Sequence, residues 1–132
     1  MTPTAGGSRR YLVHFDELAF REDLRHASPA GREVAGTART RLEREGAGVD
    51  ELRRCDPDHR EGTRLPNCVK TYLPGPDGRW RMVFEAVYDA TASELRLAYL
   101  AFGVGHPEHP WQPSAYEVAH HRLHTSGQST HE

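Results

Sequence analysis

The sequence predicts an α+β domain, in which a small antiparallel sheet is packed by two N-terminal helices and followed by a short C-terminal helix. Two observations predict it. A short run of strand-forming residues near the N-terminus precedes two stretches with helical spacing, and after residue 67 apolar and polar residues alternate in three runs separated by turns. This order indicates a meander joined by an N-terminal strand, with the helices on one sheet face. A chain of 132 residues suits one domain, expected over residues 10–124 between disordered tails at 1–9 and 125–132.

The first strand is expected at Tyr11–Phe15, where strand-forming side chains alternate. From Asp16, a suitable N-cap, the spacing becomes helical. The positions that fit the spacing of this first helix are Leu18, Phe20 or Arg21, and Leu24.

A second helix is expected from Ser28, as N-cap, and Pro29, as first helical residue, to Glu45. Gly46 follows as a stop signal. Apolar residues recur at every fourth position of this helix, at Val34, Ala38 and Leu42.

The second half of the chain predicts three strands and one helix. The strands are Cys68–Leu73, Trp80–Tyr88 and Glu94–Val104, joined by turns at Pro74–Gly78 and Asp89–Ser93. The middle strand has one face with Trp80, Met82, Phe84, Ala86 and Tyr88 and another with Arg81, Val83, Glu85 and Val87. The helix is expected over Ser114–Leu123. Residues 47–66 are polar, and only one or two helical turns are expected there, at Val49–Arg54.

Composition limits the classes of function. The chain is 36% hydrophobic and 27% charged, has no apolar run long enough for a membrane helix, and starts without the apolar core of a signal peptide. Its two cysteines, Cys55 and Cys68, are too few for a disulfide framework. We therefore expect a cytoplasmic protein without a membrane partner.

The net charge of −2 argues against binding of nucleic acid by overall charge. Charge is unevenly distributed, however. Between His59 and Arg81 there are five cations and two anions, an excess of three positive charges. The five cations are Arg60, Arg64, Lys70, Arg79 and Arg81. A nucleic-acid site is therefore expected to be a local patch in this segment.

Three segments, Gly78–Phe84, Leu100–His106 and Ala115–Leu123, carry a resemblance to a known family. The first two are similar to strands of the RelE/ParE superfamily, the toxin half of bacterial type II toxin–antitoxin pairs. The third is similar to the tyrosine-led C-terminal helix of the ribosome-dependent mRNA endonucleases in that superfamily. The resemblance covers roughly residues 11–123. It implies an endoribonuclease without cofactor or metal, which acts on mRNA at the ribosome, binds a cognate antitoxin and is able to form a homodimer.

The resemblance also implies which residues form the site. The implied catalytic residues are Lys70, Arg81, His106 and Tyr116. Further RNA contacts are expected from Arg60, Arg64, Arg79 and His120. Two positions differ from the family, since Tyr72 stands where a second lysine is common and Pro107 where an arginine is found.

These residue types suit RNA cleavage without a metal, in which the 2′-OH attacks the adjacent phosphate. The site must remove the hydroxyl proton, stabilise the phosphorane and protonate the leaving 5′-oxygen. We assign Arg81 to the phosphorane and Lys70 to phosphate charge, because a guanidinium matches phosphate oxygens and an ammonium is a compact charge. Imidazoles titrate near neutral pH, so His106 is assigned to proton transfer. Tyr116 is assigned to proton transfer or base positioning.

Each assignment has a structural alternative. Arg81 can pair with Glu85 on its own strand face, and Lys70 can be a solvated strand residue. His106 can be a loop histidine, and Tyr116 can anchor the last helix to the core. A metal site is a further alternative, because His120 and His124 have the spacing of zinc ligands on a helix and His106 or His109 could join them. No His-Glu-x-x-His motif supports zinc, so we predict no metal site.

Two other functions remain open from the sequence. One is a binding function, either ParE-like inhibition of DNA gyrase or a relative that has lost catalysis. Such a protein does not need the set Lys70, Arg81, His106 and Tyr116, which is therefore the discriminating feature. The other is a small metal-dependent enzyme, which would contain stoichiometric zinc after purification.

Overall fold

The computed structural model describes residues 9–55, 65–74, 80–107 and 112–130, with side chains as far as Thr125. Within these ranges the protein is α+β, with helices packed on a mostly antiparallel sheet, which confirms the predicted fold class. Residues 1–8 and most of the predicted turn at 74–78 lie outside the described residues. None of the described helices has the length and apolar character that crossing a bilayer requires.

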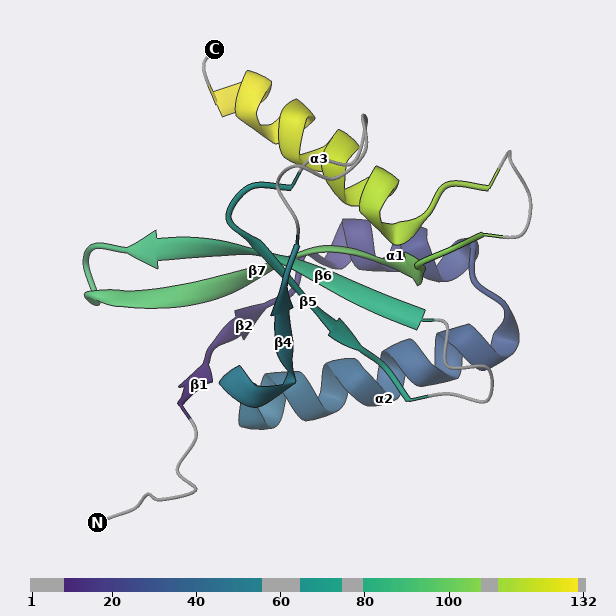
Figure 1. Cartoon of the computed structure of the whole chain (residues 1–132), viewed down its shortest axis with the longest axis horizontal. Helices are drawn as coiled ribbons and strands as arrows, with labels where there is room; N and C mark the ends of the chain where they lie inside the picture. The colour runs from purple at the N-terminus through teal and green to yellow at the C-terminus, as the bar shows by residue number, and fades with distance from the viewer. Residues whose placement is uncertain (1–8, 56–64, 75–79, 108–111, 131–132) are drawn as a thin grey trace.

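The described residues form a five-stranded sheet at the centre of the molecule, in the order β2-β7-β6-β5-β4 (Figure 1). Its strands are β2 (Val13–His14), β4 (Leu52–Arg54), β5 (Cys68–Tyr72), β6 (Trp80–Asp89) and β7 (Glu94–Val104). β5, β6 and β7 pair antiparallel, as the predicted meander requires. β2 runs parallel to β7, from which it is separated in the chain by α1, α2 and the elements from β3 to β6.

The predicted N-terminal strand Tyr11–Phe15 is divided into two short strands. β1 (Arg10–Tyr11) pairs antiparallel with β3 (Ala47–Gly48) in a separate ladder, whereas β2 joins the main sheet. Between β1 and β2, the carbonyl of Leu12 accepts a hydrogen bond from the Leu97 N–H at 2.9 Å. The change of partner at Leu12 therefore lets one short segment take part in both ladders.

The two N-terminal helices begin at the predicted N-caps. α1 (Glu17–Arg25) follows Asp16, and α2 (Pro29–Glu45) follows Ser28. Each cap side chain accepts a hydrogen bond from a backbone N–H of the first turn, at 3.2 Å and 3.1 Å respectively. Gly46 ends α2 with a φ of 77°, a conformation that favours glycine. Local capping chemistry thus sets these helix boundaries.

Two groups of buried side chains lie on the two faces of the sheet. α1 and α2 contribute Phe20, Ala35, Ala38 and Leu42, which pack with Trp80, Met82 and Phe84 of β6. The other group contains Val83, Ala101, Ala115 and Ala119. Leu18, which was expected on the apolar face of α1, is instead 79% exposed, because α1 buries the face that carries Phe20 and Asp23.

α3 (Ala115–Thr130) lies on the opposite side of the sheet from α2 (Figure 1). The expectation that all helices cover one sheet face is therefore wrong. α3 lies on the other face because its Ala115 and Ala119 pack against Val83 and Ala101, whose side chains point away from α2. Alanines allow the helix to lie close to the strands.

α3 also continues beyond its predicted end at Leu123. It includes residues 125–130, which were predicted to belong to a disordered tail. No proline interrupts this stretch, so the backbone hydrogen bonds of the helix can continue. Residues 131–132 lie outside the described part of the chain.

β7 contains a bulge beside the core. Val83 of β6 pairs with Ala101, but Phe84 pairs with Tyr99, so Leu100 is an extra residue in β7. Leu100 and Ala101 therefore both belong to the core under α3, although they are consecutive. The strict alternation of β7 side chains between the two sheet faces, which the sequence predicted, is therefore interrupted at Leu100.

Residues 47–54 form short sheet segments as well as the expected helical turn. After β3, the single turn η1 (Val49–Glu51) leads into β4, which pairs antiparallel with β5. Glu51 fixes this path, because its carboxylate accepts hydrogen bonds from Arg41 at 2.8 Å and from the Gly48 N–H at 3.0 Å. The prediction of helical turns was wrong for Leu52–Arg54, which are a strand because β5 pairs with them.

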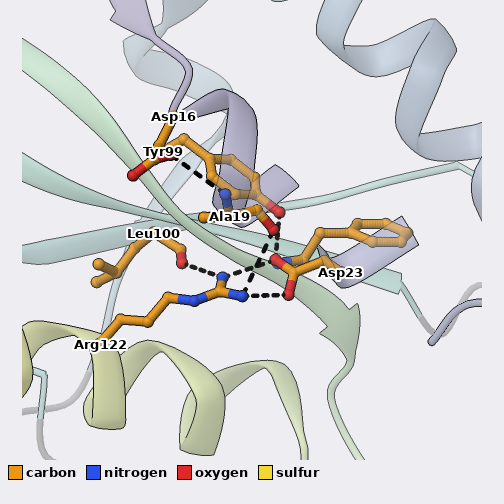
Figure 2. A network of polar contacts seen from close by, with 7 residues as sticks. Asp16, Ala19, Asp23, Tyr99, Leu100 and Arg122 are labelled. Atoms are coloured by element: carbon orange, nitrogen blue, oxygen red, sulfur yellow. Dashed lines mark hydrogen bonds and ion pairs between the residues drawn. The ribbon is translucent and has the colours of Figure 1, made fainter. Parts of the chain in front are cut away.

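An ion pair covers the edge of β7 beyond the end of β2 (Figure 2). Arg122 of α3 donates to both carboxylate oxygens of Asp23 on α1, at 2.7 and 2.8 Å. Asp23 also accepts the Phe102 N–H and the Tyr99 hydroxyl, while Arg122 donates to the Leu100 carbonyl. These bonds satisfy backbone groups that a neighbouring strand would otherwise pair. The ion pair therefore joins α1, β7 and α3.

Candidate functional site

Two cations and two phenols form a cluster on the α3 side of the sheet. We call Lys70, Tyr72, Arg81 and Tyr116 the basic–tyrosine cluster. Lys70 and Tyr72 are two positions apart on β5 and share a face, and Tyr72 is the direct pairing partner of Arg81 on β6. Tyr116 lies in the first turn of α3. Three of the four predicted catalytic residues are therefore brought together.

The contacts within the cluster link each cation to a phenol. Lys70 Nζ donates a hydrogen bond to Tyr116 Oη at 3.2 Å, and it lies 4.8 Å from the centre of the Tyr116 ring. The same Nζ is 5.6 Å from the centre of the Tyr72 ring. Arg81 Cζ lies 4.1 Å from the centre of the Tyr72 ring, a cation–π geometry. Tyr72 is thus in contact with both cations.

The start of α3 places Tyr116 in this cluster. The Glu117 N–H donates to Ser114 Oγ at 3.1 Å, and the Ser114 N–H donates to a carboxylate oxygen of Glu117 at 2.8 Å, which fixes the first turn. Ala115 packs closely on Gly103, where an added Cβ would lie 3.6 Å from the Ala115 backbone. Gly103 pairs with Arg81, so the first turn of α3 lies beside the strand that carries the arginine.

Lys70 remains positively charged at neutral pH. Burial disfavours its charged form, but the hydrogen bond with Tyr116 and the nearby Tyr72 and Cys55 outweigh this, so the pKa of Lys70 is raised above its ordinary value. The side chain can therefore supply charge to a phosphate and is unsuited to act as a base. In its bond with Tyr116, Lys70 Nζ donates and the phenol oxygen accepts.

His106 lies at the margin of the cluster. It is exposed and follows the end of β7 by two residues. Its neighbour Gly105 is buried, and an added Cβ there would lie 3.2 Å from Arg81 Nε. The backbone that leads to His106 therefore packs against Arg81, and the imidazole is placed in solvent beside the cluster.

Several predicted site residues are outside the described part of the chain. Arg60, Arg64, Arg79 and His109 belong to this group. His120 is described, and it lies one helical turn after Tyr116 in a half-buried position. Of the basic patch predicted between His59 and Arg81, the structure therefore places only Lys70 and Arg81.

His120 and His124, two of the three described histidines of α3, form a pair without further metal ligands among the described residues. The rings of His120 and His124 are 4.2 Å apart between centroids, as their spacing on the helix requires. Among the described residues, no group of three or more histidine, cysteine, aspartate or glutamate side chains could hold a metal ion. A metal centre therefore has no support within these residues.

Both cysteines lie close to the cluster, but their thiols are unreactive at neutral pH. They are buried free thiols, and the Cys55 N–H donates to the Cys68 carbonyl at 3.0 Å. Burial raises the pKa of Cys55 to about 11 and that of Cys68 to about 12. Both thiols are therefore protonated at neutral pH, and we assign them no nucleophilic role.

Tyr72 is the member of the cluster that was not predicted as a site residue. Tyr72 is 55% exposed. The sequence could have indicated Tyr72 as a site residue, because it follows Lys70 by two positions on a strand and their side chains therefore share one face. Its pairing with Arg81 depends on the hairpin register, which the sequence did not fix.

A separate cavity of about 620 Å³ lies between α1, the end of β7 and the start of α3. Its walls include Trp80, Phe102 and Val118, together with the ion pair of Asp23 and Arg122. No residue of the basic–tyrosine cluster lines it. The polar groups of the ion pair are already bonded to the protein, so this cavity offers mainly apolar surface.

Comparisons of the chain with models of protein families, with curated proteins and with solved structures found no match.

Proposed function

We propose that the protein is a cytoplasmic endoribonuclease, the toxin of a type II toxin–antitoxin pair, which cleaves mRNA at the ribosome without a metal. The observation that carries this proposal is the convergence of Lys70, Arg81 and Tyr116 on one face of the sheet, with His106 at its margin. An ammonium, a guanidinium, a phenol and an imidazole are together sufficient for cleavage by an adjacent 2′-OH.

The proposed step conserves atoms and charge. The 2′-oxygen forms a bond to phosphorus as its proton passes to the imidazole of His106, and the bond from phosphorus to the 5′-oxygen breaks. Arg81 and Lys70 stabilise the negative charge of the phosphorane. Tyr116 donates its proton to the leaving 5′-oxygen, and the ammonium of Lys70 stabilises the charge that remains on the phenol. The products are a 2′,3′-cyclic phosphate and a 5′-hydroxyl.

Cleavage of ribosome-bound mRNA by purified protein tests this function. Arg81→Ala and His106→Ala are each expected to lower the rate by at least about 100-fold. Matched controls are Arg96→Ala and His14→Ala, because both residues are exposed and lie away from the cluster. Arg96 pairs with Val87 near the β6–β7 hairpin, and His14 lies on β2, an edge strand of the sheet. Wild-type rates in both site variants would contradict the proposed assignment.

The second candidate is a binding function, either ParE-like inhibition of DNA gyrase or a non-catalytic role. It is favoured by the apolar cavity of about 620 Å³, which is separate from the cluster, and by the net charge of −2. Induced expression distinguishes the two. A fall in translation with intact DNA supports the nuclease, whereas a DNA-damage response with intact mRNA supports gyrase inhibition.

The proposed antitoxin is a protein that binds across the sheet and helices and blocks the cluster. Co-expression of a small protein encoded beside this chain is expected to restore growth and to co-purify with it. A neighbouring gene product that neither binds the protein nor relieves its toxicity would contradict this part of the proposal.

A further inference from the structure

We propose that Tyr72 is a stacking surface for one base of single-stranded RNA, so that the basic–tyrosine cluster binds a nucleotide as well as a phosphate. This inference rests on the proposed function and adds to it a substrate class and a base-binding residue. Tyr72 was not among the residues predicted to form the site.

Tyr72 is exposed where its neighbours on the chain are not. Tyr72 is 55% exposed, whereas Thr71 and Leu73 on either side are 2% and 3% exposed. Isolated exposed aromatic residues are common and need no explanation. Tyr72 differs from them because two cations lie against its ring, Arg81 at 4.1 Å and Lys70 at 5.6 Å.

The two cations restrict the ring and leave part of it open. Arg81 is half-buried and lies against Gly105, so the guanidinium that contacts the Tyr72 ring is itself held in place. More than half of the Tyr72 surface nevertheless remains in contact with solvent. A flat ring that is held in place loses little freedom when a second flat ring stacks on it.

This combination selects a nucleotide rather than a simple anion. A base can stack on the open surface of Tyr72, while its phosphate lies against Lys70 and Arg81. A bare phosphate would use the cations but not the ring. In an A-form duplex the bases already stack on one another, so a base that stacks on a side chain must come from a single strand.

Equilibrium binding to RNA that cannot be cleaved tests the inference. The probe is a fluorescent single-stranded RNA of about ten nucleotides with 2′-O-methyl groups throughout, since this modification removes the attacking hydroxyl. Anisotropy at low salt gives the affinity, because the phosphate contribution weakens with salt. The same RNA annealed to its complement is the duplex comparison.

Tyr72→Ala is expected to weaken binding of the single strand by roughly 5- to 150-fold, the range that corresponds to the loss of one stacked base. Tyr72→Phe keeps the ring and is expected to bind within about twofold of the wild type. The matched control is Tyr88→Ala, since Tyr88 is 63% exposed but lies at the far end of β6, where it pairs with Leu95. This control is expected to bind as the wild type does.

Several results would overturn the inference: wild-type affinity in Tyr72→Ala, an equal loss in Tyr72→Phe, equal affinity for the duplex, or no binding by the wild-type protein. Failure of the proposed function gives a different result. Binding that depends on Tyr72, together with intact unmodified RNA on ribosomes, would retain the base-binding role and exclude the nuclease. Cleavage that is unchanged in Tyr72→Ala would retain the nuclease and exclude the base-binding role.

Discussion

Lys70 and Tyr116 are 46 positions apart in the sequence, yet the hydrogen bond between their side chains is 3.2 Å long. This bond places a lasting positive charge beside a phenol group. Neither residue alone provides both properties. The chemistry we propose therefore depends on how α3 is placed over β5.

The change Tyr116→Phe separates this chemistry from the packing of α3. It keeps the ring and removes the oxygen, so the free energy of unfolding is expected to fall by only about 1 kcal/mol. Cleavage of ribosome-bound mRNA is expected to fall by roughly 100-fold or more, because the proton donor is lost. Urea unfolding and cleavage rates measure the two effects. Tyr88→Phe is the control, and an equal fall in its cleavage rate would contradict a specific role for Tyr116.

Glu51 gives a pH-dependent contribution to stability. Burial alone would raise the pKa of Glu51, but its bonds with Arg41, the Gly48 N–H and Thr71 outweigh this, so the pKa is lowered from its ordinary value. Stability from such an acid is present above its ordinary pKa and is lost as pH falls through the lowered folded-state pKa. We therefore expect the difference in unfolding free energy between wild type and Glu51→Gln to be constant near neutral pH and to shrink in acid.

Urea titrations at a series of pH values test this expectation. Glu45→Gln is the comparison variant, because Glu45 is exposed and paired only with its neighbour Arg44 among the ion pairs between described residues. A difference for Glu51→Gln that grows as the solution is acidified would contradict the assigned direction.

The residues of the site could be predicted from the sequence only in part. Lys70, Arg81 and Tyr116 were identified by resemblance, and no spacing rule relates positions that meet only through strand pairing and helix placement. Tyr72 could be placed on the face of Lys70 by alternation, but its stacking on Arg81 required the register of the hairpin. His106 was predicted as a full member and is instead at the margin.

Among the secondary-structure elements, α2 gives a direct comparison of two glycines. A Cβ added at Gly31 would lie 2.5 Å from the Trp80 ring, whereas nothing lies within 4 Å of one added at Gly36. Gly31→Ala is expected to destabilise the protein by about 1–3 kcal/mol, because the buried ring must move. Gly36→Ala is expected to stabilise it by about 0.5–1 kcal/mol through helix propensity. Thermal or urea unfolding measures both, and the same sign for the two variants would contradict this packing of α2.

The ion pair between Asp23 and Arg122 connects three elements. Their side chains are 4% and 22% exposed respectively, so loss of one partner leaves a poorly solvated charge. Arg122→Met is therefore expected to reduce the free energy of unfolding by about 3 kcal/mol. Arg21→Met is the control, because Arg21 is 72% exposed in its pair with Glu17 and should contribute less than about 1 kcal/mol.

A double-mutant cycle tests whether this loss comes from the pair itself. When Asp23→Asn and Arg122→Met are combined, the loss is expected to be smaller than the sum of the single losses, because neither charge is then left alone. Additive losses would contradict a direct interaction between the two residues.

Elements with local signals were predicted well, and elements that depend on distant partners were not. Ser28, Pro29 and Gly46 defined α2 because capping is a property of adjacent residues. β4 was missed because Leu52–Arg54 become a strand only by pairing with β5. The bulge at Leu100 and the position of α3 were also missed, since both depend on how the finished sheet is covered.

At the scale of the whole molecule, the two faces of the sheet have different roles, with α2 on one side and α3 on the other (Figure 1). The face toward α1 and α2 contains the aromatic core, with Phe15, Phe20, Phe84 and Tyr99 in mutual ring contact. The face toward α3 is built from smaller side chains and carries the basic–tyrosine cluster. Tyr72, the exposed residue of the cluster, can therefore be changed with little effect on the main core.

The chemical nature of the RNA ends tests the central proposal most directly. Purified protein is incubated with translating ribosomes, and the 5′ and 3′ ends of the cleaved mRNA are mapped and typed. Attack by the 2′-OH predicts 2′,3′-cyclic phosphates and 5′-hydroxyls, which should disappear with Arg81→Ala and persist with Arg96→Ala. Intact mRNA, or ends that carry 5′-phosphates, would contradict a nuclease built from Lys70, Arg81 and Tyr116.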